Sequence, residues 1–443
     1  MISRIDFSNQ AYSFSELKKN LPRPQVDVNQ ATSVVEPIVE RVKSEGAQAL
    51  KFYAEKFDHV IPRTFLVPEQ VLKTSLESLS PELRESLEES ITRLQQVHLA
   101  QVPQDFTVEV ATGARVSQRW IPVRRVGLYV PGGLAVYPSS VIMNVVAAKS
   151  AGVQSLVVVS PPQRESRDGY PHPTILAACE LLGVKEVYAV GGAQAVAMLA
   201  YGVSDLDGDG IDFESVDVIT GPGNVFVATA KRLVRGAVGI DAEAGPTEIA
   251  ILADDSADPR HIAADLISQA EHDPLAASVL VTDSSELISA VSNELEIQVK
   301  TTKHQERVRT ALGGQQSALI LVRDLFQGID IVNAYGAEHL EIQTREPQSV
   351  ASKITSAGAI FVGPYSPVPL GDYMAGSNHV LPTGGCAHYA SGLGVHSYLK
   401  AVQVIEYSKA ALREIENKIV SFANSEDLPA HGSAIQVRFN DDK

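Results

Sequence analysis

Gln269 and His272 are two residues whose types and spacing could do chemistry. Asp258 and Pro259 predict the start of a helix, and Pro274 predicts its end just past His272. Residues three apart leave the same side of a helix, so an amide oxygen and an imidazole could together supply half of a metal site. The alternative is a helix end whose polar side chains face water, and the pair alone favours that alternative.

Glu338 and His339 form a second suggestive pair. Neighbours in sequence do not share a helix face, so from a turn they could reach different atoms of one ligand. An imidazole can move a proton near neutral pH, and a desolvated carboxylate can activate water. A capping Glu beside a hydrogen-bonded His explains the pair equally well.

Asp372 and His379 lie in the glycine-rich stretch 371–379, which reads GDYMAGSNH and predicts a loop. A loop carboxylate in this setting indicates function, although a turn-forming Asp and a hydrogen-bonded loop His remain alternatives. Added to Gln269 and His272, Asp372 gives a mixed oxygen and nitrogen set that one further His would complete. Such a set suits zinc, with manganese or cobalt as plausible substitutes.

The chain has only two cysteines, Cys179 and Cys386. Two are too few for a disulfide framework, which favours a reducing cytoplasm. Cys386 with His388 nearby could oxidise an aldehyde as a nucleophile. No pattern activates the thiol, so a small packing residue is the favoured interpretation.

Short apolar strands and helices alternate from residue 126, which predicts a parallel sheet covered on both faces. The predicted strands are 126–130, 155–160, 186–190 and 216–220. The predicted helices are 139–151, 173–182, one opening at 191–194 and one ending at 234.

Glycine turns follow three of these strands, at 131–133, 191–192 and 221–223. Ligands of such sheets bind at the carboxyl ends of the strands, so these turns could bring backbone close to a phosphate-bearing ligand. None is a G-x-G-x-x-G, and tight turns without a ligand are an equal alternative.

A second round of alternation begins at residue 248 and predicts a second α/β domain. Residues before 24 predict a polar arm with one helical turn at 15–20, and 34–100 has helical periodicity. A final helix, 402–422, precedes a polar tail. The predicted strands of the second round are 248–252, 278–282, 318–322 and 359–362, and its helices are 258–272, 285–294, 328–335 and 349–356.

The acidic insert 204–214 has the aspartates of a calcium-binding loop. The twelfth position, which should be Glu, is Val216, so an ordinary surface loop is favoured.

The composition is that of a globular protein with ample core, because 44% of residues are hydrophobic and 20% are charged. The 443 residues suffice for roughly two or three domains. The net charge of −16 argues against nucleic acid or an anionic membrane as partner and suits a small cationic substrate. We expect no signal peptide and no membrane span.

Taken together, these motifs resemble the histidinol dehydrogenase family, over nearly the whole chain and in one order. So many long motifs make the resemblance highly specific. The matching stretches are 125–133 (RVGLYVPGG), 137–140 (YPSS), 191–195, 221–224, 244–248 (AGPTE), 268–272, 337–340 and 371–383 (GDYMAGSNHVLPT).

The resemblance implies roles residue by residue. The implied zinc ligands are Gln269, His272, Asp372 and, from the partner subunit of a homodimer, His431. The implied substrate contacts are these four residues with Thr247, His339, His379 and Glu426. The implied NAD contacts are Tyr129, Gln194 and Asn224. Thr247 stands where the family often has Ser, which keeps the hydroxyl.

The fold implied by the family is two incomplete Rossmann-like, doubly wound domains with small N- and C-terminal arm domains in an intertwined homodimer. The implied division is 1–26 as N-terminal arm, 27–129 with 249–392 as the domain of the metal and catalytic residues, 130–248 as the NAD-side domain, and 393–443 as the C-terminal helix and tail.

The implied reaction is the four-electron oxidation of L-histidinol through the aldehyde to L-histidine with two NAD, the last step of histidine biosynthesis. His339 would take the alcohol proton, and Glu338 would activate the water that hydrates the aldehyde. Alternatives are a zinc hydrolase, a Cys386-dependent aldehyde dehydrogenase, a dehydrogenase of a related amino alcohol, and a two-lobed binding protein of periplasmic type.

Overall fold

The computed structural model describes residues 2–10, 12–24, 28–132, 136–242 and 245–442. Gly133 and Ala244, which belong to two of the predicted motifs, lie outside these ranges. The described chain divides into two compact units. The first comprises Met1–Gln101 and Arg124–Tyr398, and the second comprises Val102–Val123 and Leu399–Lys443.

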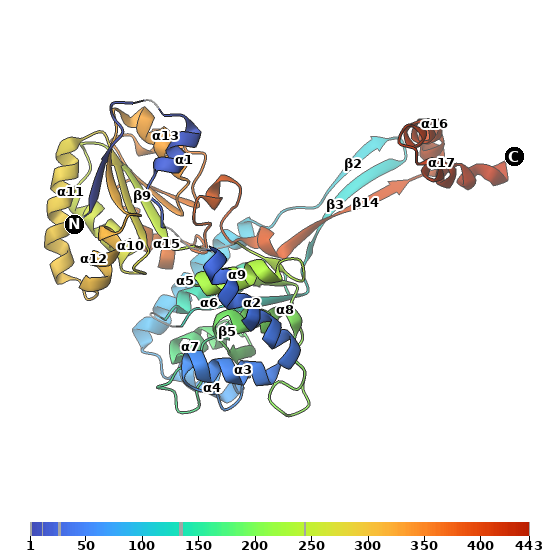
Figure 1. The fold of residues 1–443 in the computed structure, drawn as a ribbon. Coiled ribbons are helices and arrows are strands. Elements are labelled where there is room, and N and C mark those ends of the chain that lie inside the picture. Colours follow the sequence, from blue (N-terminus) through green and yellow to red (C-terminus); the bar gives the residue numbers. More distant parts are fainter. Residues whose placement is uncertain (1, 11, 25–27, 133–135, 243–244, 443) are drawn as a thin grey trace. The chain divides into compact units, whose positions relative to one another are not determined.

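The first unit contains a parallel sheet that includes β5 (Figure 1). Within the described residues this sheet has five strands, in the order β6-β5-β4-β7-β8. Every residue of β4 is buried, as expected for a strand with both faces covered. The parallel sheet predicted from residue 126 onward is therefore confirmed. Its strands are β4 Arg125–Tyr129, β5 Ser155–Ser160, β6 Glu186–Ala189, β7 Val218–Thr220 and β8 Gly239–Ile240.

Helices from two separate parts of the chain cover this sheet. The predicted ones are α6 Pro138–Ser150, α7 Pro173–Leu181, α8 Gly192–Tyr201 and α9 Val225–Val234. Before them in sequence come α2 Val28–Glu45, α3 Ala47–Tyr53, η1 Ala54–Asp58, α4 Glu69–Glu77 and α5 Pro81–Ala100. In this early group, α2 packs on α8 and α9, α4 on α7, and α5 on α6.

This packing differs from the predicted division, which grouped 27–129 with the catalytic domain. The apolar stripe of α2 instead joins the core of the five-stranded sheet, through Val35, Ile38 and Val42. Helical periodicity identifies a buried face but contains no information about which sheet that face meets. That part of the predicted division was wrong.

The first unit also contains a parallel sheet of six strands in the described part of the chain, in the order β1-β11-β10-β9-β12-β13. Residues predicted to form an N-terminal arm supply its edge strand β1, paired in parallel with β11. The prediction of a separate arm was therefore wrong for this segment. The strands are β1 Ser3–Asp6, β9 Glu248–Ala253, β10 Ala277–Thr282, β11 Ala318–Leu321, β12 His339–Gln343 and β13 Ala359–Val362.

Alternating residues of β9 face two separate cores. Ile249 and Ile251 pack with α10, α11 and α12, whereas Ala250 and Leu252 pack with α1 and α13. This two-sided burial requires the continuous apolar run that predicted the strand. The helices are α1 Phe14–Asn20, α10 Pro259–Ala270, α11 Ser285–Gln298, α12 Gln305–Gly313, α13 Leu325–Tyr335 and α14 Pro347–Ala351. A short helix, α15 Val368–Tyr373, occupies part of the stretch predicted as a loop.

The second unit joins residues distant in sequence. Its described part is an antiparallel sheet of three strands, in the order β14-β3-β2, followed by α16 Lys409–Ser425, α17 Pro429–Gln436 and η5 Val437–Asp442. The strands are β2 Phe106–Ala111, β3 Ala114–Pro122 and β14 Leu399–Tyr407. The helix predicted over 402–422 was therefore wrong for residues 402–407, which belong to β14. This strand pairs with β3, which is distant in sequence, so the local pattern did not reveal it.

The acidic insert 204–214 closes on backbone N–H groups. Asp207 accepts hydrogen bonds from the amides of Phe65 and Leu66, at 2.6 and 3.0 Å. Asp205 accepts one from Gly210 at 2.6 Å. These contacts give the insert a structural explanation, in agreement with the surface loop that was favoured.

A pair of buried carboxyl groups connects α10 to β12. Asp265 on α10 is 8% exposed, and Glu341 on β12 is fully buried. Burial raises the pKa of Asp265 to about 6. Burial and the nearby Asp265 raise the pKa of Glu341 well above its usual range, so Glu341 donates its proton to Asp265. Oε1 of Glu341 accepts the N–H of Val368, the first residue of α15, at 2.9 Å.

This shared proton predicts a stability that falls as pH rises. Because folding raises both pKa values, the stability linked to these protons is present at low pH and is lost as pH rises, through about 6 for Asp265 and through the raised pKa of Glu341. Glu341→Gln should reduce this loss, since an amide donates to Asp265 at every pH. We expect the variant to exceed the wild-type Tm by at least about 2 °C at alkaline pH but not at acid pH. Calorimetry across this pH range would test this, and equal slopes for both proteins would contradict it.

Candidate active site

The catalytic candidates lie at the amino ends of β9 and β12. Thr247 immediately precedes β9, and Glu338 immediately precedes His339, the first residue of β12. Gln269 lies near the carboxyl end of α10. A crossover helix runs antiparallel to the parallel strands that it connects, so its carboxyl end lies near their amino ends. Helix ends and strand starts therefore share this edge. The glycine turns at strand carboxyl ends predicted ligand binding for the five-stranded sheet, whereas the candidates of this sheet lie at the opposite, amino ends.

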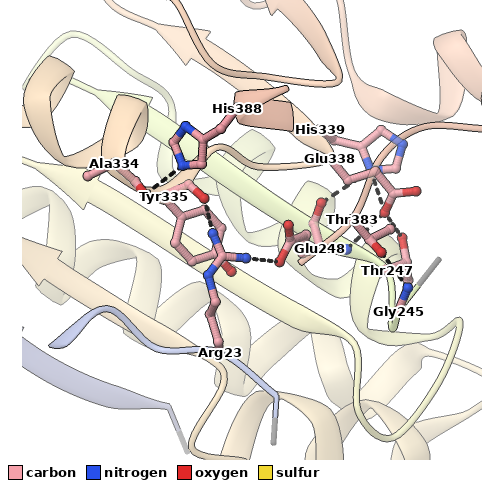
Figure 2. A network of polar contacts seen from close by, with 10 residues as sticks. All are labelled: Arg23, Gly245, Thr247, Glu248, Ala334, Tyr335, Glu338, His339, Thr383 and His388. Carbon is pink, nitrogen blue, oxygen red and sulfur yellow. Dashed lines mark hydrogen bonds and ion pairs between the residues drawn. The ribbon is translucent and has the colours of Figure 1, made fainter. Parts of the chain in front are cut away.

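The main chain of Glu248 holds both catalytic candidates (Figure 2). Its N–H donates to Oε2 of Glu338 at 3.0 Å, and its carbonyl oxygen lies 3.3 Å from Nδ1 of His339. The hydroxyl of Thr247 donates to the same Glu338 oxygen at 2.5 Å. Gln269 Nε2 in turn donates to Thr247 Oγ1 at 2.5 Å.

These contacts fix the tautomer of His339. A carbonyl oxygen can only accept, so Nδ1 must carry the hydrogen and Nε2 must carry the lone pair. Nε2 is buried and has no hydrogen-bond partner among the described residues. Burial lowers the pKa of His339 to about 4, so the ring is neutral at physiological pH. His339 therefore presents a free, unprotonated nitrogen.

Glu338 has the electrostatics of a proton-exchanging group. Burial raises its pKa to about 7, although the hydrogen bonds from Thr247 and Glu248 oppose the shift. Its side chain is 9% exposed and lies 3.6 Å from His339 Nδ1. A carboxyl group with this pKa can accept and release a proton near neutrality.

Asp372 and His379 lie near the same pair. Nδ1 of His379 is 3.9 Å from the Asp372 carboxylate and 3.2 Å from its carbonyl oxygen. Nε2 of His379 is 3.2 Å from Oγ of Ser140, to which the sequence assigned no role. The signal was present, because Ser140 belongs to the YPSS motif. Burial raises the pKa of Asp372 and lowers that of His379 to about 4.

His272 belongs to the same electrostatic neighbourhood. It lies close enough to interact electrostatically with Glu338, His339, Asp372 and His379. It also lines a cavity of about 400 Å³, large enough for a small metabolite. Other lining residues are Tyr137, Ser139, Arg307 and Tyr373.

The predicted cofactor contacts gather at the carboxyl ends of the five-stranded sheet, as expected. The Tyr129 hydroxyl accepts the N–H of Gly192 at 3.1 Å, and burial raises the Tyr129 pKa to about 12. Gln194 is 2% exposed, and its Oε1 has no partner in the described part of the chain. Asn224 is exposed and caps α9 by accepting from Phe226 and Val227.

A buried ion pair that the sequence did not indicate fixes the Gly221 turn. Lys231 and Asp241 form this pair, with side chains 2% and 6% exposed. Lys231 donates to the carbonyl oxygen of Gly221 at 3.0 Å, and the N–H of Gly221 donates to Asp241 at 2.8 Å. Gly221 has φ +113°, and a Cβ there would overlap the Tyr129 carbonyl oxygen, so glycine is required.

Comparison with known proteins decides the family. A family model described as histidinol dehydrogenase matches residues 21–439. The chain is 59% identical over 438 residues to histidinol dehydrogenase from Nocardia farcinica, spanning 99% of this chain and 98% of that one. It is 58% identical over 438 residues to the enzyme from Mycolicibacterium smegmatis, with the same coverage. The chain belongs to the histidinol dehydrogenase family.

The fold agrees with this assignment. The crystal structure of histidinol dehydrogenase from Elizabethkingia anophelis superposes with a TM-score of 0.91 at 30% identity, covering 100% of this chain and 99% of that one. The resemblance stated from the motifs is confirmed, as is the enzyme class, an NAD-dependent oxidoreductase. Membership of this family excludes the hydrolase and the periplasmic-type binding protein. In the described part of the chain, no helix is both long and apolar enough to cross a membrane.

Among the described residues, Cys386 and His388 contact other groups and not each other. Its Sγ accepts the hydroxyl of Tyr389 at 3.1 Å. The nitrogens of His388 contact Ser356 Oγ at 3.0 Å and the Ala334 carbonyl at 3.3 Å instead. His388 therefore does not activate the thiol.

The predicted zinc ligands of histidinol dehydrogenase divide between the two units. Gln269, His272 and Asp372 lie in the first unit, whereas His431 and the substrate candidate Glu426 are exposed residues of the second. Across the described residues, no group of three or more His, Cys, Asp or Glu side chains could by itself hold a metal ion. Because Gln269 is an amide, the predicted set contributes only two side chains of those types from the first unit.

The donors of the first unit nevertheless fit a zinc ion. Gln269 Oε1 is buried without a hydrogen-bond partner within the described ranges, while its Nε2 is held by Thr247. A buried acceptor left free in this way is expected where a cation binds. An amide oxygen, an imidazole and a carboxylate together form a donor set suited to zinc.

Proposed function

We propose that this chain oxidises L-histidinol through L-histidinaldehyde to L-histidine, transferring two hydrides in succession to NAD. The observation that carries the proposal is the arrangement around Glu248. Its main chain orients a neutral His339, with a free Nε2, beside a Glu338 whose pKa is about 7. This arrangement supplies the two proton acceptors that an alcohol and an aldehyde oxidation require.

In the first step, His339 takes the proton of the substrate hydroxyl at Nε2 as a hydride leaves the carbinol carbon for NAD. The Nδ1 hydrogen bond to the Glu248 carbonyl holds the ring and stabilises the imidazolium that forms. The pKa of about 4 keeps His339 deprotonated, and therefore ready, at neutral pH.

In the second step, Glu338 removes a proton from the water that attacks the aldehyde. The resulting hydrate loses a second hydride to NAD and becomes the carboxylate of histidine. Thr247 and the Glu248 amide both donate to Oε2 of Glu338, which leaves its other oxygen available for water.

Zinc would be held by Gln269, His272, Asp372 and His431 of the partner subunit. When bound, it would hold the imidazole and amine of the substrate and so orient the alcohol carbon. Support comes from the Gln269 oxygen, which has no partner among the described residues, and from the carboxylate of Asp372, which is only 16% exposed. His379 and Thr247 of the same subunit, with Glu426 of the partner subunit, would complete the substrate contacts.

An exposed apolar face of the second unit supports the proposed homodimer. Phe106, Val108 and Ile405 are 52%, 49% and 66% exposed. Val108 lies opposite Val116, which lies opposite Ile405, so these side chains share one face of the sheet. Contiguous exposed apolar surface of this kind marks an association site.

The cytoplasmic location stays a prediction, which cell fractionation would test.

We expect two NADH per L-histidinol oxidised by the purified protein. The activity and the bound zinc, measured by elemental analysis, should be lost together on chelation and restored together by zinc. Activity that persists after all metal has been removed would contradict the zinc proposal. A protein that binds NAD but leaves histidinol unoxidised would contradict the substrate.

We expect Glu338→Gln to impair the two half-reactions unequally. Aldehyde oxidation should fall by about 10²–10⁴-fold, because the amide cannot take a proton from water. Alcohol oxidation should change far less, since His339 serves that step. Single-turnover NADH formation from histidinol and from histidinaldehyde separates the two, and equal losses would contradict this division.

We expect mixed subunits to reveal the shared site. His339→Asn and His431→Ala homodimers should each be nearly inactive. When they are unfolded and refolded together, about a quarter of the wild-type activity should return, because each heterodimer contains one site free of both substitutions. An absence of recovery, with heterodimers verified by mass spectrometry, would place both residues in a site formed by one subunit.

A further inference from the structure

Arg23, between α1 and α2, reaches the main chain that holds the catalytic pair (Figure 2). Its Nη1 donates to Oε2 of Glu248 at 2.8 Å, and its Nη2 donates to the carbonyl oxygen of Tyr335. Its guanidinium carbon lies 4.2 Å from the centroid of the Tyr335 ring. One side chain therefore contacts both β9 and the end of α13.

The carboxylate of Glu248 depends on this partner. Glu248 is fully buried, and its Oε1 has no hydrogen-bond partner among the residues described. Burial raises its pKa to about 7, and the charge of Arg23 opposes that shift. Removing one member of a buried ion pair leaves the other charge uncompensated, so the strand must move or the carboxyl must take up a proton.

The two segments that Arg23 joins are the ones that set the catalytic geometry. The amide and carbonyl of Glu248 hold Glu338 and His339. Tyr335 ends α13 three residues before Glu338. His388 supports the same helix end, because its Nε2 contacts the carbonyl of Ala334 at 3.3 Å. Any slip between β9 and this helix end would alter the contacts of both catalytic side chains.

We propose that Arg23 is a positioning residue for both oxidation steps, acting through the Glu248 carboxylate and the Tyr335 carbonyl. The inference rests on the roles proposed above for Glu338 and His339. Arg23 needs no contact with the substrate for this role. Its effect is to keep the strand start and the helix end in register.

The test compares Arg23→Met with a matched control, Arg41→Met. Arg41 on α2 also pairs with a carboxylate, Glu45 at 2.8 Å, and lies 4.1 Å from an aromatic ring centroid, that of Phe52. We expect Arg23→Met to lower kcat in both half-reactions by about 10–100-fold, because both catalytic side chains share one support. KM for histidinol and NAD should stay within about two-fold, and the control should match wild type.

A double variant tests the route through Glu248. Arg23→Met with Glu248→Gln removes the unpaired buried charge at nearly constant volume, so its kcat should exceed that of Arg23→Met alone. Arg23→Lys, which keeps the charge but loses the planar fork, should give an intermediate kcat. This conservative variant also serves if Arg23→Met does not fold. All rates are measured below the Tm of each variant.

Several results would overturn the proposal. These are an unchanged kcat in Arg23→Met, a loss confined to one half-reaction, a rise in KM alone, and a double variant no more active than the single one. A rise in KM alone would place Arg23 in contact with substrate. Failure of the wild-type protein to oxidise histidinol would contradict the proposed function instead.

Discussion

The peptide groups of Glu248 are the constraint on which the proposed active site depends. At the start of a strand, an N–H and a C=O can be left without ladder partners, and they must be satisfied if buried. Here the N–H meets the Glu338 carboxylate and the C=O meets the His339 imidazole. The backbone of Glu248 thus makes Glu338 a hydrogen-bond acceptor and fixes the tautomer of His339.

The two parallel sheets place their chemistry at opposite ends of their strands. In the five-stranded sheet, Tyr129, Gly192 and Asn224 lie at strand carboxyl ends, where helix N-termini point and can bind a phosphate-bearing cofactor. In the six-stranded sheet, the proposed catalytic residues lie at the amino ends of the strands, near the carboxyl ends of the helices. The contact between Ser140 and His379 connects the two groups of residues within the first unit.

Three pairs of buried ionisable groups support the residues of both sheets. Lys231 with Asp241 fixes the Gly221 turn, and Arg23 with Glu248 connects β9 to the end of α13. Asp265 with Glu341 connects α10 to β12 through a shared proton. Replacing such pairs with apolar residues often preserves stability, so their presence here is better explained by the geometry that they maintain.

Local sequence was sufficient for much of the fold and for the types of the site residues. Continuous apolar runs predicted most of the parallel strands, and Asp258 with Pro259 predicted the start of α10, where Asp258 accepts the amide of Arg260 at 2.9 Å. The motifs identified the family. These features are encoded within a few residues of one another, so they can be recognised without the tertiary structure.

Tertiary structure alone decided which segments pair. The local sequence did not indicate that Ser3–Asp6 joins the six-stranded sheet or that α2 covers the five-stranded sheet. It also did not indicate that 399–407 is a strand paired with β3. Arg23 and Glu248 are 225 residues apart, and no local pattern around either residue indicates that they form a pair. Periodicity and capping reflect neighbours along the chain, whereas pairing, register and buried charge partners depend on contacts that form only when distant segments pack together.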